Sequence, residues 1–245
     1  MLDVPQLTAE EILSRVLHRD GLMLVIDKPA GLPVHRGPKG GPNLEASFDA
    51  LRFGLPRPPV LAHRLDKDTS GCLVLGRHRK ATASLGLLFK HGKIAKTYWT
   101  VIEGGPAADE GTIDLSLGRL NAERGWWQKP DPQGQEAITN WKVLGRGDGL
   151  TWLAMEPVTG RTHQLRVHAA SQGWPIVGDN IYGTQASLRR LRNEKFIPRV
   201  GEPRLHLHSR EIGIPISRNK EPIRVVAPAP EHMRERLRAC GWNGE

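Results

Sequence analysis

The stretch HRLDKDTSG (residues 63–71) places Asp66 two residues after an arginine and follows it with Asp68, a Thr-Ser pair and a glycine. A nucleophilic aspartate must be ionised and fixed in direction, and a nearby arginine favours the ionised form. The same residues also suit an ordinary turn between two strands, in which both aspartates make turn hydrogen bonds. The local residues alone favour the turn, so the rest of the chain must decide between the two interpretations.

Short elements punctuated by glycine and proline surround this stretch. Apolar patterning, caps and stop residues predict strands at 21–29, 72–77, 95–104, 137–145, 150–158 and 204–216, and helices at 8–17, 80–92, 160–173 and 229–241. The two strands that flank Arg-Gly-Asp-Gly are expected to form a hairpin. Thr8 and Thr162 are the expected caps of their helices. Strands and helices mix without a βαβ rhythm, which indicates an α+β fold with a mixed or mostly antiparallel sheet.

Composition limits the classes of function. The chain has 245 residues and a formal net charge of +9, which favours a polyanionic partner such as nucleic acid. Two cysteines, Cys72 and Cys240, supply neither a disulfide framework nor a zinc cluster and suggest a reducing, cytoplasmic location. Neither a signal peptide nor an apolar run long enough to cross a membrane is apparent. We expect one catalytic domain over residues 1–245, with its core at about 20–230.

A lysine and a tyrosine two residues apart, Lys96 and Tyr98, lie in the strand predicted at 95–104. Residues two apart share one face of a strand, so a cation and an aromatic ring would lie together. Such a pair can hold a phosphate and stack on a base. An amphipathic edge strand is an equally good interpretation of these residues alone.

The stretch GRTHQLRVH (residues 160–168) concentrates Arg161, His163, Arg166 and His168 at a helix start. Two arginines oppose the helix dipole there, so we expect a negative group to meet them. The histidine spacing is not that of a helical zinc pair, and no third ligand is evident. We therefore expect no metal, and we prefer a binding role to a solvated basic helix.

Three other features are less informative. In the pair Trp126–Trp127 the rings could stack on bases, although packing of one ring into the core is the preferred interpretation. His206 and His208 fit a polar strand face, and Asp179 fits a turn in which its side chain makes hydrogen bonds.

Taken in order, HRLDKDTSG, KTY (96–98), GRTHQLRVH and PIVGDNIYG (175–183) resemble the RluA family of RNA pseudouridine synthases. DKPAGLPVH (27–35) and RLHLHSREIGIPI (204–216) extend the resemblance over about Leu22 to Pro228. Cys72 stands where the family usually has leucine, a small change in packing. About 20 residues precede the first strand, too few for the S4 RNA-binding module of many relatives, so we expect the core and its loops to recognise RNA.

The resemblance implies a synthase core, a long mixed or antiparallel sheet flanked by helices with a central catalytic cleft. It implies that uridine in tRNA or rRNA is isomerised without cofactor or metal, on a nucleotide flipped out of its stack. Asp66 matches the essential aspartate, Tyr98 the active-site tyrosine, and Arg166 the arginine that pairs with the aspartate. Leu165 would pack against the base. The residues expected to position phosphate, ribose or the flipped nucleotide are Arg64, Lys96, Arg161 and His163.

Two other classes of function compete with the synthase. The first is an RNA-binding protein or RNA chaperone on the same fold, which would have no use for Asp66, Tyr98 and Arg166 together. The second is a phosphate-handling hydrolase, which would need a metal site or phosphate loop that the sequence does not display. The sequence therefore favours a cytoplasmic, monomeric RNA pseudouridine synthase.

Overall fold

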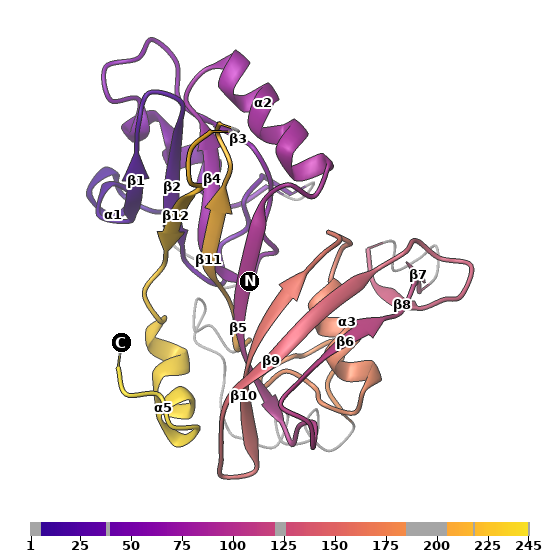
Figure 1. Cartoon of the computed structure of the whole chain (residues 1–245). Coiled ribbons are helices and arrows are strands. Elements are labelled where there is room, and N and C mark those ends of the chain that lie inside the picture. Colours follow the sequence, from indigo (N-terminus) through magenta and orange to yellow (C-terminus); the bar gives the residue numbers. More distant parts are fainter. Residues whose placement is uncertain (1–5, 38–39, 121–125, 185–204, 218, 245) are drawn as a thin grey trace. The chain divides into compact units, whose positions relative to one another are not determined.

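The computed structural model describes residues 6–37, 40–120, 126–184, 205–217 and 219–244, which form two compact units (Figure 1). Within these residues, unit 1 comprises 6–96 and 209–228, and unit 2 comprises 97–184, 205–208 and 229–244. Each unit is therefore completed by a segment from the C-terminal part of the chain. The expectation of one catalytic domain over the whole chain stays a prediction.

Unit 1 is built around two strands, Met23–Lys28 and Ser70–Gly76, whose side chains are buried on both faces almost throughout. Its elements are α1 (Ala9–Leu13), β1 (Val16–Arg19), β2 (Met23–Lys28), the 3-10 helix η1 (Leu44–Leu51), β3 (Val60–Leu61), β4 (Ser70–Gly76), α2 (Arg79–Lys90), most of β11 (Leu207–Ile214) and β12 (Ile223–Val226). Alternate residues of β2 and β4 pack against Leu85, Leu88 and Phe89 of α2. The apolar residues of this helix thus cover the sheet.

Unit 2 places its strands between two helices. Its elements are most of β5 (Ala95–Glu103), β6 (Glu110–Asp114), β7 (Leu117–Arg119), β8 (Gln128–Pro130), β9 (Ile138–Gly147), β10 (Leu150–Pro157), α3 (Gln164–Ser171) and α5 (Glu231–Ala239). Ile102, Leu153 and Leu165 of α3 belong to one apolar cluster. Trp99 and Trp152 pack instead with residues of α5. Alternate residues of β5 and β10 therefore serve two cores.

Ten strands form a sheet in the order β1-β2-β4-β11-β5-β10-β9-β6, with β12 beside β11 and β3 beside β4. Every register described is antiparallel. Asp148 and Gly149 turn the β9–β10 hairpin with positive φ angles, as the Asp-Gly pair predicts. The expected α+β fold, a long mixed sheet with flanking helices, is confirmed, whereas the central cleft stays a prediction.

Three local predictions are wrong. The helix predicted at 8–17 has the expected capping box of Thr8 and Glu11 but ends at Leu13, and Val16–Arg19 forms β1. Pairing with the buried strand β2 outweighs the weak helical preference of this segment. Thr162 was expected to cap α3, but it does not. One ring of Trp126–Trp127 was expected to pack into the core, but neither ring is fully buried.

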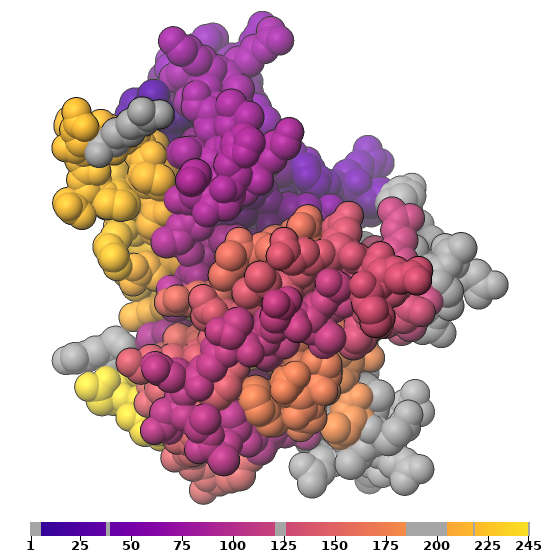
Figure 2. Space-filling model, turned by 45° about the vertical axis from the view of Figure 1, so that its right-hand side comes forward, coloured from indigo at the N-terminus to yellow at the C-terminus, as the bar shows by residue number. Residues whose placement is uncertain are grey.

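Figure 2 shows the surface of the molecule from one side, with the side chains of α2 at the surface of unit 1 (magenta). No helix within the described residues is long and apolar enough to cross a membrane.

Candidate active site

Asp66 occupies the first position of a tight turn between β3 and β4 in unit 1. The backbone N–H of Thr69 donates to the carbonyl oxygen of Asp66 at 3.2 Å, and aspartate is a favoured residue at this position of a turn. The Asp66 side chain is partly buried, and that of Arg64 is exposed. The backbone therefore turns between two strands at Asp66, and a turn of this kind holds a carboxylate in a fixed direction.

Lys28, at the end of β2, holds this turn by hydrogen bonds to its backbone. Its side chain is fully buried, and Nζ donates to the carbonyl oxygens of Pro29 at 2.9 Å, Lys67 at 2.9 Å and Thr69 at 2.8 Å. Burial lowers the pKa of Lys28 to about 7, while the negative charges of Asp68, Asp66 and Asp27 oppose this shift. An ammonium has three N–H donors, so the protonated form satisfies all three carbonyls.

His63 fastens the other end of the same loop. Its Nε2 accepts a hydrogen bond from the backbone N–H of Val74 in β4 at 3.0 Å, and its ring stacks on Phe89 of α2 with centroids 4.1 Å apart. Burial lowers the pKa of His63 to about 3, and the positive charge of Lys96 adds to this shift. His63 is therefore a neutral structural residue of the HRLD stretch.

Gly71 allows β4 to begin directly after the turn. Its φ angle is +103°, and a Cβ atom there would lie 2.2 Å from the carbonyl oxygen of Ser209 in β11. Any side chain would thus be both strained and blocked by backbone. In the register of the β2–β4 pair, Gly71 lies opposite Lys28, which brings the anchoring lysine under the turn.

Tyr98 and Leu165 share one core of unit 2. Leu165 is buried, and partly buried Tyr98 packs against the same cluster, opposite Met155 of β10. Lys96, two residues earlier in β5, is partly buried in unit 1, and this burial lowers its pKa. The ring that the sequence expects beside a base thus packs against the same apolar cluster as the leucine expected to pack on the base.

A buried ion pair holds Arg166 at the first turn of α3. Its Nε and one terminal nitrogen donate to the two carboxylate oxygens of Asp179 at 2.8 and 2.7 Å, and both side chains are almost fully buried. Burial alone would raise the pKa of Asp179, but the hydrogen bonds and charge of Arg166 hold it below its ordinary value. Asp179 also accepts from the backbone N–H groups of Ile181 and Tyr182, as its turn predicts.

The start of α3 is organised by Gln164 rather than by Thr162. The Gln164 side-chain oxygen accepts from the Arg161 N–H at 3.0 Å and from the Thr159 hydroxyl at 2.7 Å. His163 precedes the helix with a left-handed φ of 54°, a conformation that leaves the exposed Thr162 outside the cap. The Arg161 side chain, partly buried, donates to the carbonyl oxygen of Glu136.

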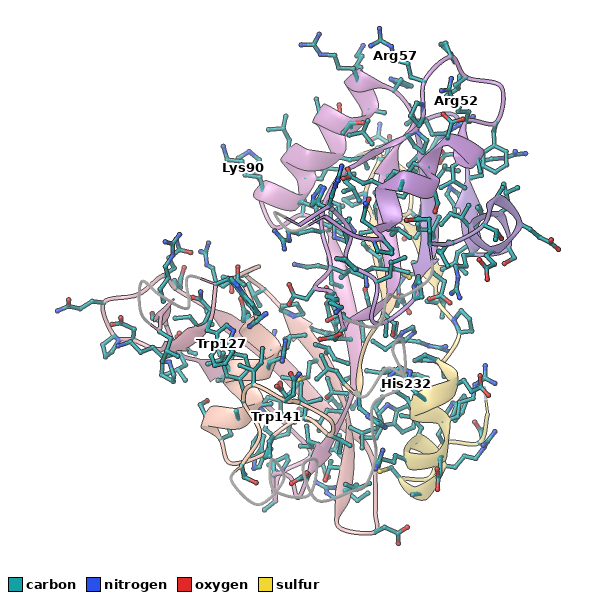
Figure 3. All side chains as sticks on the ribbon, turned by 180° about the vertical axis from the view of Figure 1, so that it is seen from behind. Arg52, Arg57, Lys90, Trp127, Trp141 and His232 are labelled. Carbon is teal, nitrogen blue, oxygen red and sulfur yellow. The ribbon has the colours of Figure 1, made fainter. Side chains whose placement is uncertain are left out.

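His163 links the helix to an aromatic group of unit 2. Its Nδ1 lies 2.7 Å from the hydroxyl of Tyr182, whose ring faces the guanidinium of Arg166 at 5.2 Å. The ring of Trp126, 59% exposed, meets His163 edge-on at 5.4 Å. Trp127, labelled in Figure 3, is partly buried. The buried Arg166, His163 and His168 exclude the interpretation of α3 as a solvated basic helix.

The structure distributes the predicted site residues between the two units. Unit 1 contains Arg64, Asp66 and Lys96, and unit 2 contains Tyr98, Arg161, His163, Leu165 and Arg166. Neither Lys28 nor Tyr182 was identified from the sequence as a residue of the site. Asp179 was also not identified as the carboxylate that pairs with Arg166 in unit 2. The signals were present, since Lys28 lies in the quoted DKPAGLPVH stretch and Asp179 and Tyr182 lie in PIVGDNIYG. Within the described residues, no group of three or more potential ligands could hold a metal ion.

The fold is that of a class of RNA-modifying enzymes. Residues 22–171 match the sequence profile of the RNA pseudouridylate synthase family. The chain therefore belongs to the RNA pseudouridine synthases, and within them to the RluA family. It is an isomerase that acts on RNA.

Individual relatives support this assignment. An uncharacterized RNA pseudouridine synthase of Zymomonas mobilis is 42% identical over 90% of this chain and 95% of its own length. The ribosomal large subunit pseudouridine synthase D of Xanthomonas campestris is 35% identical over 94% of this chain and 70% of its own length. The solved structure of human RNA pseudouridylate synthase domain containing 4 has a TM-score of 0.74 and 28% identity, covering 94% of this chain and 95% of that one.

Proposed function

We propose that this cytoplasmic synthase acts as a monomer on specific uridines of tRNA or rRNA, with Asp66 as the catalytic nucleophile or base. The observation that carries the assignment of Asp66 is its turn, whose backbone carbonyls are bound by the buried Lys28. An aspartate on so firmly anchored a turn is preorganised toward a substrate. The ribosomal name of the Xanthomonas campestris relative supports rRNA as one substrate class.

The reaction conserves atoms and electrons. The bond between the ribose and N1 of uracil breaks, the base rotates, and a new bond joins the ribose to C5. The proton that C5 loses balances the proton that N1 gains, so the isomerisation requires neither oxidant nor group donor. The target atoms lie in a stacked base, and the uridine must therefore leave the stack to reach the enzyme.

The other predicted residues have roles in the same proposal. Asp66 attacks or deprotonates the nucleoside, Tyr98 stacks on the base and helps to remove the C5 proton, and Arg166 pairs with Asp66. Leu165 packs against the base. Positioning of phosphate, ribose and the flipped nucleotide falls to Arg64, Lys96, Arg161 and His163.

Substitution Asp66→Ala tests the catalytic assignment. We expect pseudouridine formation to fall by at least about 10⁴-fold, the scale on which loss of a catalytic nucleophile acts. RNA affinity should change by less than about threefold, because the lost group is negative and adds nothing to phosphate binding. The matched control is Asp68→Ala, which removes the second aspartate of the same turn and should keep most of the activity. Full turnover by the Asp66→Ala variant would refute the assignment.

Pseudouridine mapping of total RNA identifies the substrate. Cells lacking the gene are compared with cells complemented by the wild type or by Asp66→Ala. Sites that disappear on deletion and return only with the wild type are the enzyme's targets. Return of those sites with the alanine variant would contradict the proposed role of Asp66.

A further inference from the structure

The chain between Asp68 and Glu103 contains no acidic residue but carries Arg77, Arg79, Lys80, Lys90, Lys93 and Lys96. This segment includes the whole of α2, which lies in unit 1. The helix packs against the sheet through Ala81 and Leu85 and leaves its charged residues on the outside. The charged side chains of this segment are therefore all lysine or arginine, whereas the 26 acidic residues of the chain lie outside it.

Four of these cations form an exposed set, which we call the α2 basic face. They are Arg79 and Lys80 in the first turn, Lys90 in the last turn, and Lys93 directly after the helix. Within the part of the chain that the structure describes, no carboxylate forms an ion pair with any of them. Figure 3 shows the Lys90 side chain projecting outward from the helix. Over the length of α2, the face presents positive charge at both ends of a twelve-residue helix.

The position of Arg79 and Lys80 is unfavourable for the helix itself. The N-terminal turn carries partial positive charge, so cations there oppose the helix dipole. The first turn of α2 contains no acidic residue. In contrast, α5 has Glu231 in its first turn and Arg236 and Arg238 in its last, the arrangement that stabilises a helix. The charges of α5 are thus explained by helix stability, and those at the start of α2 are not.

We propose that the α2 basic face binds phosphate groups of the RNA substrate, as a sequence-independent contact of unit 1. The proposal rests on the proposed function only in taking RNA as the substrate. A polyanion supplies the negative charge that the helix terminus and the unpaired cations lack. Because phosphates carry no sequence information, this face sets affinity and orientation rather than the choice of uridine.

The test compares paired substitutions that neutralise equal charge. The variants Arg79→Gln/Lys80→Gln and Lys90→Gln/Lys93→Gln act on the α2 basic face. Arg234→Gln/Arg238→Gln is the matched control, because both arginines are exposed on the helix α5 of unit 2. Glutamine forms helix well, so the helices should persist. The probes are unfractionated tRNA and a large-subunit rRNA transcript, with dissociation constants measured over a range of salt concentrations.

Each α2 variant should raise the dissociation constant about tenfold at low salt, and should reduce the slope of log K against log salt by about 1.5 to 2. For pseudouridine formation, KM should rise while kcat at saturating RNA stays within about twofold. The melting temperature of Arg79→Gln/Lys80→Gln should equal or exceed that of the wild type, because the substitutions remove unfavourable charge from the helix start.

Two results would overturn the proposal. One is an α2 variant with wild-type affinity and salt slope, and the other is an equal loss in the α5 control, which would show an effect of net charge alone. The result is independent of the catalytic assignment, because binding is measured directly. If no RNA is modified but α2 variants alone lose affinity, the proposed function fails and the α2 basic face stands.

Discussion

Lys28 is a buried side chain that organises the turn of Asp66, the residue proposed as catalytic. Its ammonium binds the carbonyls of Lys67 and Thr69, which flank Asp68 in the turn that begins at Asp66. Substitution Lys28→Met keeps much of the side-chain volume but removes all three donors. We expect kcat to fall about 100-fold, the cost of misplacing a reacting group by about 1 Å. KM should change by less than about threefold, because Lys28 is fully buried and makes no contact with solvent.

The control for this residue is Lys220→Met, which removes an exposed lysine of the same unit. It should leave kcat unchanged. Single-turnover pseudouridine formation separates the chemical step from RNA binding, and circular dichroism verifies that both variants are folded. A Lys28→Met variant that is folded and retains wild-type kcat would show that the anchor is dispensable.

At the scale of elements, sequence patterns predicted the four α-helices and six of the twelve strands within the described residues, but not the partners of these strands. The apolar runs at β2 and β4, the amphipathic α2 and the Asp-Gly hairpin all follow from local residues. The register that puts Lys28 opposite Gly71 depends on pairing between strands far apart in the chain, which periodicity does not encode. The family resemblance implied Asp66 as the carboxylate partner of Arg166, and local sequence patterns did not reveal the bidentate partner within unit 2, which is Asp179.

Arg166 lies in the first turn of α3, where a cation opposes the helix dipole, and Asp179 neutralises its charge. Substitution Asp179→Asn breaks the buried bidentate ion pair with Arg166, which costs about 3–5 kcal/mol of unfolding free energy. Asp109→Asn is the matched control in unit 2, since the Asp109 side chain is 81% exposed in its pair with Arg146. That exposed pair should contribute less than about 1 kcal/mol. Denaturant titrations measure both values, and equal losses would contradict the importance of burial.

For the whole molecule, stability at acidic pH depends on histidines whose pKa values burial lowers in both units. Burial lowers the pKa of His63 to about 3 in unit 1, and it also lowers the pKa values of His168 and His232 in unit 2. Below pH of about 6.5 the unfolded chain binds protons that these folded sites do not, so unfolding free energy falls. Asp27 acts in the opposite sense, because burial raises its folded pKa to about 6. Its contribution to stability therefore increases as pH falls from about 6 toward 3.8.

Substitution His63→Gln isolates one of these contributions. Glutamine can still accept from the Val74 N–H but has no proton to gain, so the stability of the variant should depend less on pH. Between pH 6.5 and about 4, the slope of unfolding free energy against pH should decrease by up to about 1.4 kcal/mol per pH unit, which corresponds to one proton. Far-UV circular dichroism is the appropriate probe, because all seven tryptophans lie in unit 2 and would not report on His63 directly. His91→Gln, an exposed histidine of unit 1, should retain the wild-type slope. An unchanged slope in His63→Gln would mean that the ring of His63 accepts a proton in the folded protein as readily as in the unfolded chain.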